Sequence, residues 1–196
     1  MDSREAILSA LRRAARPSPE PSAPAFEALR FGDPAAAFAE SLAAAGGRCH
    51  RLADSAAAAA LGRLSWLAGA ADLWSAVPGL ASRREPPPGG DPRGLSDLDV
   101  AVLSGELAVA ESGAVWVVPP DPLARAALFL AERVALAVPR ERLVDNLHQA
   151  YARLPVPLPA FGCFVSGPSK TADIEQCLVI GAQGPRELHV VLFGEG

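Results

Sequence analysis

The chain has 196 residues, half of them hydrophobic, and a formal net charge of −4. This length fits one domain with a substantial core. The slight excess of acidic residues argues against nucleic acid as the main partner, because phosphate binding needs clustered lysine and arginine. The sequence has no apolar run long enough to span a membrane and no signal peptide, and its three cysteines are too few and too scattered for a disulfide framework or an iron–sulfur cluster. We therefore expect a cytoplasmic protein that binds no metal and no cofactor alone.

The N-terminal half is expected to mix short helices with short strands. Residues 1–24 predict an amphipathic helix followed by a stiff proline-rich linker, and residues 25–196 predict a single domain. Within that domain, the patterns predict helices over 34–45 and 56–67, strands over 48–52 and 73–76, and a long exposed loop over 78–94.

From residue 97 onward the pattern is regular. It predicts strands over 99–103, 114–118, 134–138, 161–165 and 188–193, and helices over 105–110, 123–132, 141–154 and from about Thr171. This alternation is typical of an α/β fold, a mostly parallel sheet with helices on both faces. In such sheets, ligands bind in the crevice outside the carboxyl ends of the strands.

The segment from Ser166 to Glu175 carries the most specific functional signal. It follows the predicted strand at 161–165, so we expect it at the carboxyl edge of the sheet. Gly167 allows a sharp turn, and Ser166, Ser169 and Thr171 bring hydroxyl groups. Lys170, the sole lysine in the sequence, adds a positive charge. If a helix begins just after them, its first N–H groups complete a cradle for phosphate or carboxylate. Ordinary helix capping explains the same residues equally well. The glycine spacing of a P-loop is absent.

Three carboxylates are candidates for orienting a ligand or moving a proton. Asp173 and Glu175 follow the turn, but on a helix they would face different ways. Glu111 precedes the predicted strand at 114–118 and could reach the same crevice. The histidines have no second ligand at metal-binding spacing, and Cys163 and Cys177 are expected to be buried, inert thiols.

The same segment resembles a known family. Ser166-Gly167-Pro168-Ser169-Lys170-Thr171-Ala172-Asp173-Ile174-Glu175 is followed by Leu178-Val179-Ile180-Gly181 and by Gly184-Pro185-Arg186-Glu187-Leu188. This run resembles the lactate-utilisation protein C family, the LUD domain. Ala108-Val109-Ala110-Glu111-Ser112-Gly113 is similar to the family's Ala-Ile-Ala-Glu-Thr-Gly segment. Ahead of it the family tends to show Gly-Val-Thr, where this chain has Ala101-Val102-Leu103, so the hydroxyl is missing at Leu103.

The resemblance implies a three-layer α/β/α sandwich like that of ribose-5-phosphate isomerase and CoA transferases. It also implies a part in oxidising L-lactate to pyruvate, with iron–sulfur clusters carried by partner proteins and a small carboxylate or phosphate as ligand. Two alternatives stay open. The chain could be a non-catalytic assembly module that docks an iron–sulfur partner, or a stand-alone transferase or ligase acting on acyl-CoA or a folate, which rests on fold analogy alone.

Overall fold

The computed structural model describes residues 3–14, 27–173 and 176–195. Helix α1 (Ser3–Ala14) is amphipathic, as the sequence predicts, and none of its residues is buried. The predicted proline-rich linker lies outside the described residues, and so does Glu175.

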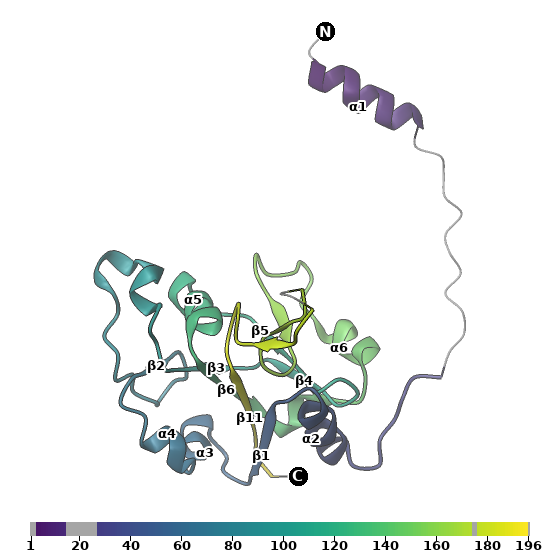
Figure 1. Ribbon diagram of the computed structural model, residues 1–196. Coiled ribbons are helices and arrows are strands. Elements are labelled where there is room, and N and C mark those ends of the chain that lie inside the picture. The colour runs from purple at the N-terminus through teal and green to yellow at the C-terminus, as the bar shows by residue number, and fades with distance from the viewer. Residues whose placement is uncertain (1–2, 15–26, 174–175, 196) are drawn as a thin grey trace.

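A five-stranded parallel sheet forms the centre of the fold (Figure 1). Its strand order is β1-β11-β6-β3-β2, and every neighbouring pair is parallel. The strands are β1 (Arg48–Leu52), β2 (Leu73–Ser75), β3 (Val100–Ser104), β6 (Arg133–Pro139) and β11 (Glu187–Phe193). The buried positions of the inner strands are apolar, with His189 of β11 as the exception, because both faces of the sheet are covered. The predicted α/β class with a mostly parallel sheet is confirmed.

A second, smaller sheet packs beside the first. Its order is β7-β4-β5-β8, with antiparallel pairs on both sides of β5. The strands are β4 (Leu107–Val109), β5 (Ala114–Val117), β7 (Leu143–Val144) and β8 (Cys163–Val165). A separate two-stranded ribbon joins β9 (Lys170–Thr171) to β10 (Val179–Ile180).

Helices cover both faces of the central sheet (Figure 1). One face packs against α3 (Ala57–Gly62) and α4 (Ser65–Ala68). The other packs against α2 (Pro34–Ala44), α5 (Pro122–Leu130) and the inner face of the second sheet. Helix α6 (Leu147–Arg153) covers the outer face of the second sheet. Side chains of Asp33, Asp121 and Asn146 cap the N-termini of α2, α5 and α6.

Several predicted elements are wrong in type or length. The predicted helix over 105–110 is strand β4, because residues 107–109 pair with both β5 and β7. The predicted helix over 141–154 begins with the 3-10 turn η3 (Arg140–Arg142) and β7, so only α6 is helical. The predicted helix over 56–67 is broken into α3 and α4. The strands at 114–118 and 161–165 exist, but they belong to the second sheet, where they pair with each other in antiparallel direction.

The long connection between β2 and β3 is held against the sheet. The predicted exposed loop over 78–94 contains the 3-10 turn η1 (Pro88–Gly90) and leads into a second, η2 (Pro92–Leu95). Arg84 ties this loop to the sheet through Asp72, at 2.7 Å from each carboxylate oxygen. The loop is therefore anchored at Arg84.

Candidate functional site

The Ser166–Glu175 turn does not open a helix in the part of it that the structure describes. Lys170 and Thr171 form β9, because they pair with Ile180 and Val179 in the ribbon. The helix N-terminus that the sequence predicts after Thr171 is therefore wrong. The backbone N–H of Ser169, in the middle of the turn, is engaged within the fold: it donates to the carbonyl of Pro185 at 2.9 Å.

The turn packs against the C-terminus of α2. The ammonium group of Lys170 donates to the carbonyl of Ala45, the C-cap of that helix. Gly167 has φ +72°, and a β-carbon there would lie 2.2 Å from the same carbonyl oxygen. Since a helix C-terminus carries partial negative charge, Lys170 complements the α2 dipole in this structure. Ser166 donates its hydroxyl to the carbonyl of Ser112 at 2.8 Å.

The position of the turn also differs from the prediction. Ala45 shortly precedes β1, and Pro185 shortly precedes β11. The turn therefore lies at the amino edge of the parallel sheet, and the predicted place at its carboxyl edge is wrong. The physical reason is that β8 is not a strand of the parallel sheet: it pairs with β5, antiparallel, in the second sheet, so its C-terminal end does not lead to the carboxyl edge of the central sheet.

The three candidate carboxylates do not converge on one crevice in the described residues. Glu111 accepts the backbone N–H of Leu147 at 2.7 Å, at the first turn of α6. Asp173 is exposed and accepts the hydroxyl of Thr171, which lowers the pKa of its carboxyl group. Glu175 lies outside the described residues. Anion binding by these carboxylates and by the turn stays a prediction.

The carboxyl edge of the central sheet carries a different pair of charged residues. Glu106 comes two residues after the end of β3, and Arg142 ends η3, which follows directly after β6. Arg142 donates from Nη1 to Glu106 Oε2 at 3.1 Å and to its carbonyl oxygen at 3.4 Å. The side chains of both residues are about half exposed. They border a depression of about 170 Å³ that Ser104 and Gly105 also line.

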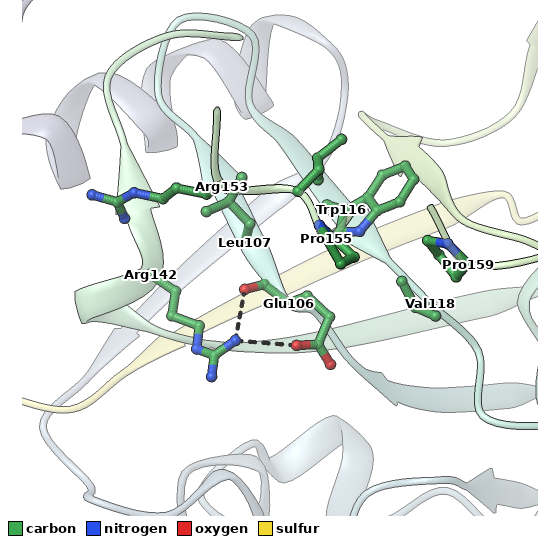
Figure 2. Close-up of a pocket in the computed structure, with 9 residues that line it drawn as sticks. Glu106, Leu107, Trp116, Val118, Arg142, Arg153, Pro155 and Pro159 are labelled. Atoms are coloured by element: carbon green, nitrogen blue, oxygen red, sulfur yellow. Dashed lines mark hydrogen bonds and ion pairs between the residues drawn. The ribbon is translucent and has the colours of Figure 1, made fainter. Parts of the chain in front are cut away.

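The same pair borders a larger cavity of about 560 Å³ (Figure 2). Arg142 and Arg153 lie toward one end of it, and Trp116, Val118 and Pro159 lie toward the other. The Trp116 ring packs on Phe164, with 4.9 Å between the ring centroids. Its indole N–H is buried and has no acceptor among the described residues. A buried donor without an acceptor is costly.

Sequence reasoning missed this region because it assigned residues 105–110 to a helix. One signal was available. Gly105 and Glu106 directly follow the buried strand β3, and the carboxyl end of a parallel strand is where ligands bind. Gly105 is needed there, since a β-carbon would lie 2.4 Å from Val115 Cγ1. The partners of Glu106 come from distant segments, and local patterns do not reveal them.

A pair of histidines, the buried His189 and the partly buried His50, lies on the α3 and α4 face of the sheet. His189 has a partner at each ring nitrogen: its Nδ1 is 3.0 Å from His50 Nε2, and its Nε2 is 3.1 Å from Glu187 Oε2. Burial lowers the pKa of His189 and of His50, while the hydrogen bond from His189 lowers the pKa of Glu187. Trp66 packs on the His189 ring at 4.2 Å between centroids. The network joins β1 to β11.

The cysteines lie in different environments. Burial raises the pKa of Cys49 to about 11 and also raises that of Cys163. Cys177 is exposed, so the prediction that it is buried is wrong. Within residues 3–14, 27–173 and 176–195, no group of three or more His, Cys, Asp or Glu side chains is arranged to hold a metal ion. No helix in these ranges is long and apolar enough to cross a membrane.

Comparison with known proteins gives consistent matches. The family model described as the LUD domain matches residues 93–193. Lactate utilization protein C of Oceanobacillus iheyensis is 31% identical over 93 residues, which cover 44% of this chain and 40% of that protein. Lactate utilization protein C 1 of Bacillus mycoides is 36% identical over 93 residues, which again cover 44% of this chain and 40% of that protein. The matches thus span about two fifths of the length of these curated relatives.

One solved structure has a similar fold. It is a crystal structure of a DUF162 family protein from Deinococcus radiodurans, with a TM-score of 0.60 and 17% sequence identity. The similarity covers 85% of this chain and all of that one. At this identity it establishes the fold alone.

Proposed function

The chain belongs to the LUD domain family, and we propose that it is a subunit of an L-lactate utilisation system. In this proposal, iron–sulfur partner proteins carry the electrons that are released when lactate is oxidised to pyruvate. Family membership and the names of the curated relatives support this role. The three cysteines of the chain are free and lie in separate places, which fits a subunit whose partners hold the clusters.

In this proposal, the chain binds the carboxylate of lactate or pyruvate at the carboxyl edge of the central sheet. The observation that carries it is the Glu106–Arg142 pair bordering the depression of about 170 Å³. A guanidinium group has five N–H donors, and the bonds to Glu106 use only Nη1. The other donors are available for a bidentate pair with a substrate carboxylate.

Glu106 gives the site a preference among small acids. An ionised carboxylate only accepts hydrogen bonds, so it can accept the hydroxyl of lactate but repels the keto oxygen of pyruvate. Lactate is therefore expected to bind more tightly than pyruvate, and Glu106→Gln is expected to reduce the difference, because the amide can also donate.

Isothermal titration calorimetry with L-lactate, pyruvate and inorganic phosphate tests the proposal. Arg142→Gln is expected to weaken lactate binding by about tenfold or more, because it removes a charge-assisted hydrogen bond. Arg140→Gln is the matched control, since Arg140 lies on the same 3-10 turn but does not border the depression. The double variant Lys170→Ala, Thr171→Ala is expected to bind like the wild type. Loss of binding in the double variant alone would place the anion at the Ser166–Glu175 turn, and absence of binding by the wild type would refute the proposed site.

A second candidate, an assembly module that docks an iron–sulfur partner, is favoured by one further observation. The side chains beside the cavity include Val156 and Leu158, which are 95% and 62% exposed. Exposed apolar groups clustered on one loop are typical of a protein–protein contact. Co-purification with the iron–sulfur proteins distinguishes the two roles. If Val156→Ser, Leu158→Ser loses the complex while lactate binding persists, this loop docks the partner.

A further inference from the structure

The cavity of about 560 Å³ beside the Glu106–Arg142 pair is larger than a small acid requires, and we propose that it binds a second ligand, an organic anion with an apolar, partly aromatic body. Its size falls within the range of pockets that hold cofactors and drug-sized molecules. The inference does not depend on lactate binding, because the cavity has its own walls and its own cation. Among the residues that the structure describes, only Glu106 and Arg142 border both hollows.

The cavity has two chemically different ends (Figure 2). Arg142 and Arg153 lie toward one end, while Trp116, Val118 and Pro159 form the other. Leu107, between them, is buried and apolar. A ligand that satisfies both ends must carry its charge on one side and its apolar surface on the other. This arrangement excludes phosphate and lactate as the ligands that fill it, because neither has an apolar body.

The charge of the lining selects an anion. The charged residues of the lining are two arginines, Arg142 and Arg153, and one carboxylate, that of Glu106, so the lining has a net positive charge. Within the described part of the chain, Arg153 forms no ion pair, whereas Arg142 is already paired with Glu106. Arg153 is thus the cation that a ligand carboxylate, sulfonate or phosphate would engage without breaking an existing pair.

The apolar end is built for a flat group. Trp116 is fixed by packing on Phe164, and its ring is approached closely by Gly162, where a β-carbon would lie 2.3 Å from a ring carbon. The neighbouring wall consists of Leu154, Pro155 and Pro159, which present rigid apolar surface. An aromatic or compact aliphatic body fits between these side chains because it loses little conformational freedom on binding.

Two probes that differ only in charge test the proposal: 2-naphthoate and its neutral analogue 2-naphthamide. Calorimetry on the full chain is expected to show that the wild type binds naphthoate about tenfold more tightly than naphthamide. Arg153→Gln is expected to remove most of this difference and leave naphthamide binding unchanged. Arg125→Gln, an arginine that lines the adjacent pocket, is the matched control and is expected to behave like the wild type.

A second variant tests the apolar end. Val118→Glu places a carboxylate in the apolar wall and is expected to abolish the binding of both probes, while circular dichroism confirms that the variant is folded. Equal affinity of the wild type for the two probes would overturn the proposal, because the cavity would then select by apolar contact alone. Failure of naphthoate to bind, or unchanged discrimination in Arg153→Gln, would overturn it as well. Since the lactate test depends on Arg142 and this one on Arg153, either can fail without the other.

Discussion

Replacing Gly167 with alanine is expected to destabilise the fold by about 2–5 kcal/mol. Two effects contribute. The residue has φ +72°, and a side chain in this left-handed region costs about 1–2 kcal/mol. In addition, the new β-carbon would lie 2.2 Å from the carbonyl oxygen of Ala45. That atom belongs to the backbone at the end of α2 and cannot rotate away, so the overlap adds about 1–3 kcal/mol.

The matched control is Gly89→Ala. Gly89 also has a left-handed backbone, at φ +66°, but a β-carbon added there would have no other atom within 4 Å. Only the conformational cost applies there, about 1–2 kcal/mol. Gly32→Ala, at an open position whose φ is not left-handed, is expected to be close to neutral.

Urea and thermal unfolding followed by circular dichroism measure these differences. For a domain of this size, each kcal/mol lowers the melting temperature by roughly 2–4 °C, so Gly167→Ala is expected to melt about 4–20 °C below the wild type. The reasoning is refuted if Gly167→Ala loses no more stability than Gly89→Ala. The Ser166–Glu175 turn would then not be held against α2 in the way that the structure shows.

Three further predictions concern the buried histidine, the cysteines and the end of β3. Burial lowers the pKa of His189 below its ordinary 6.5, so on acidification the unfolded chain takes up a proton before the folded protein does. The free energy of unfolding should therefore fall as the pH drops below about 6.5. His189→Gln should flatten this pH dependence in urea titrations at several pH values. Cys177 is exposed, whereas Cys49 is partly buried and its pKa is raised to about 11. Iodoacetamide at pH 8 should therefore label Cys177 faster by at least about tenfold in peptide mass spectrometry, and equal rates would contradict the raised pKa of Cys49. Gly105→Ala forces a β-carbon into two valine side chains and should lower the free energy of unfolding by about 1–3 kcal/mol. It should also weaken lactate binding in calorimetry, because Glu106 follows directly in the chain. Unchanged affinity for lactate would count against the carboxyl-edge site.

The central sheet is the part of the fold that could be predicted from the sequence. Strands β3, β6 and β11 are almost entirely apolar because each strand is covered by helices or by the second sheet on both faces. Burial of this kind leaves a local signature that needs no knowledge of the strand's partners.

The second sheet shows where that signature is insufficient. Strand β5 is also a continuous apolar run, yet its neighbours are antiparallel. It is buried on both faces because one core lies inside the sheet and α6 covers the outside. The direction of a strand depends on which distant segment pairs with it, and the pattern of one segment does not contain that information. Because the sequence pattern assigned β5 and β8 to the parallel sheet, the predicted position of the Ser166–Glu175 turn was wrong as well.

The candidate site was less predictable than the fold for the same reason. The residues of the Ser166–Glu175 turn attract attention by their composition, but Lys170 finds its partner at Ala45, far away in the sequence. Glu106 and Arg142 look like ordinary surface charges until β3 and β6 are placed side by side. Only Gly105, at the end of a buried strand, gave a local indication of this edge.

The position of β11 has a consequence for how the chain is made. It is the last strand of the described sequence, but it lies between β1 and β6 in the central sheet. During synthesis, β1 leaves the ribosome early and has no neighbour in this sheet until β11 follows. Sheets dominated by such non-local pairing fold slowly, and unpaired strand edges promote aggregation. The protein is therefore expected to complete its central sheet only after residue 193 has left the ribosome.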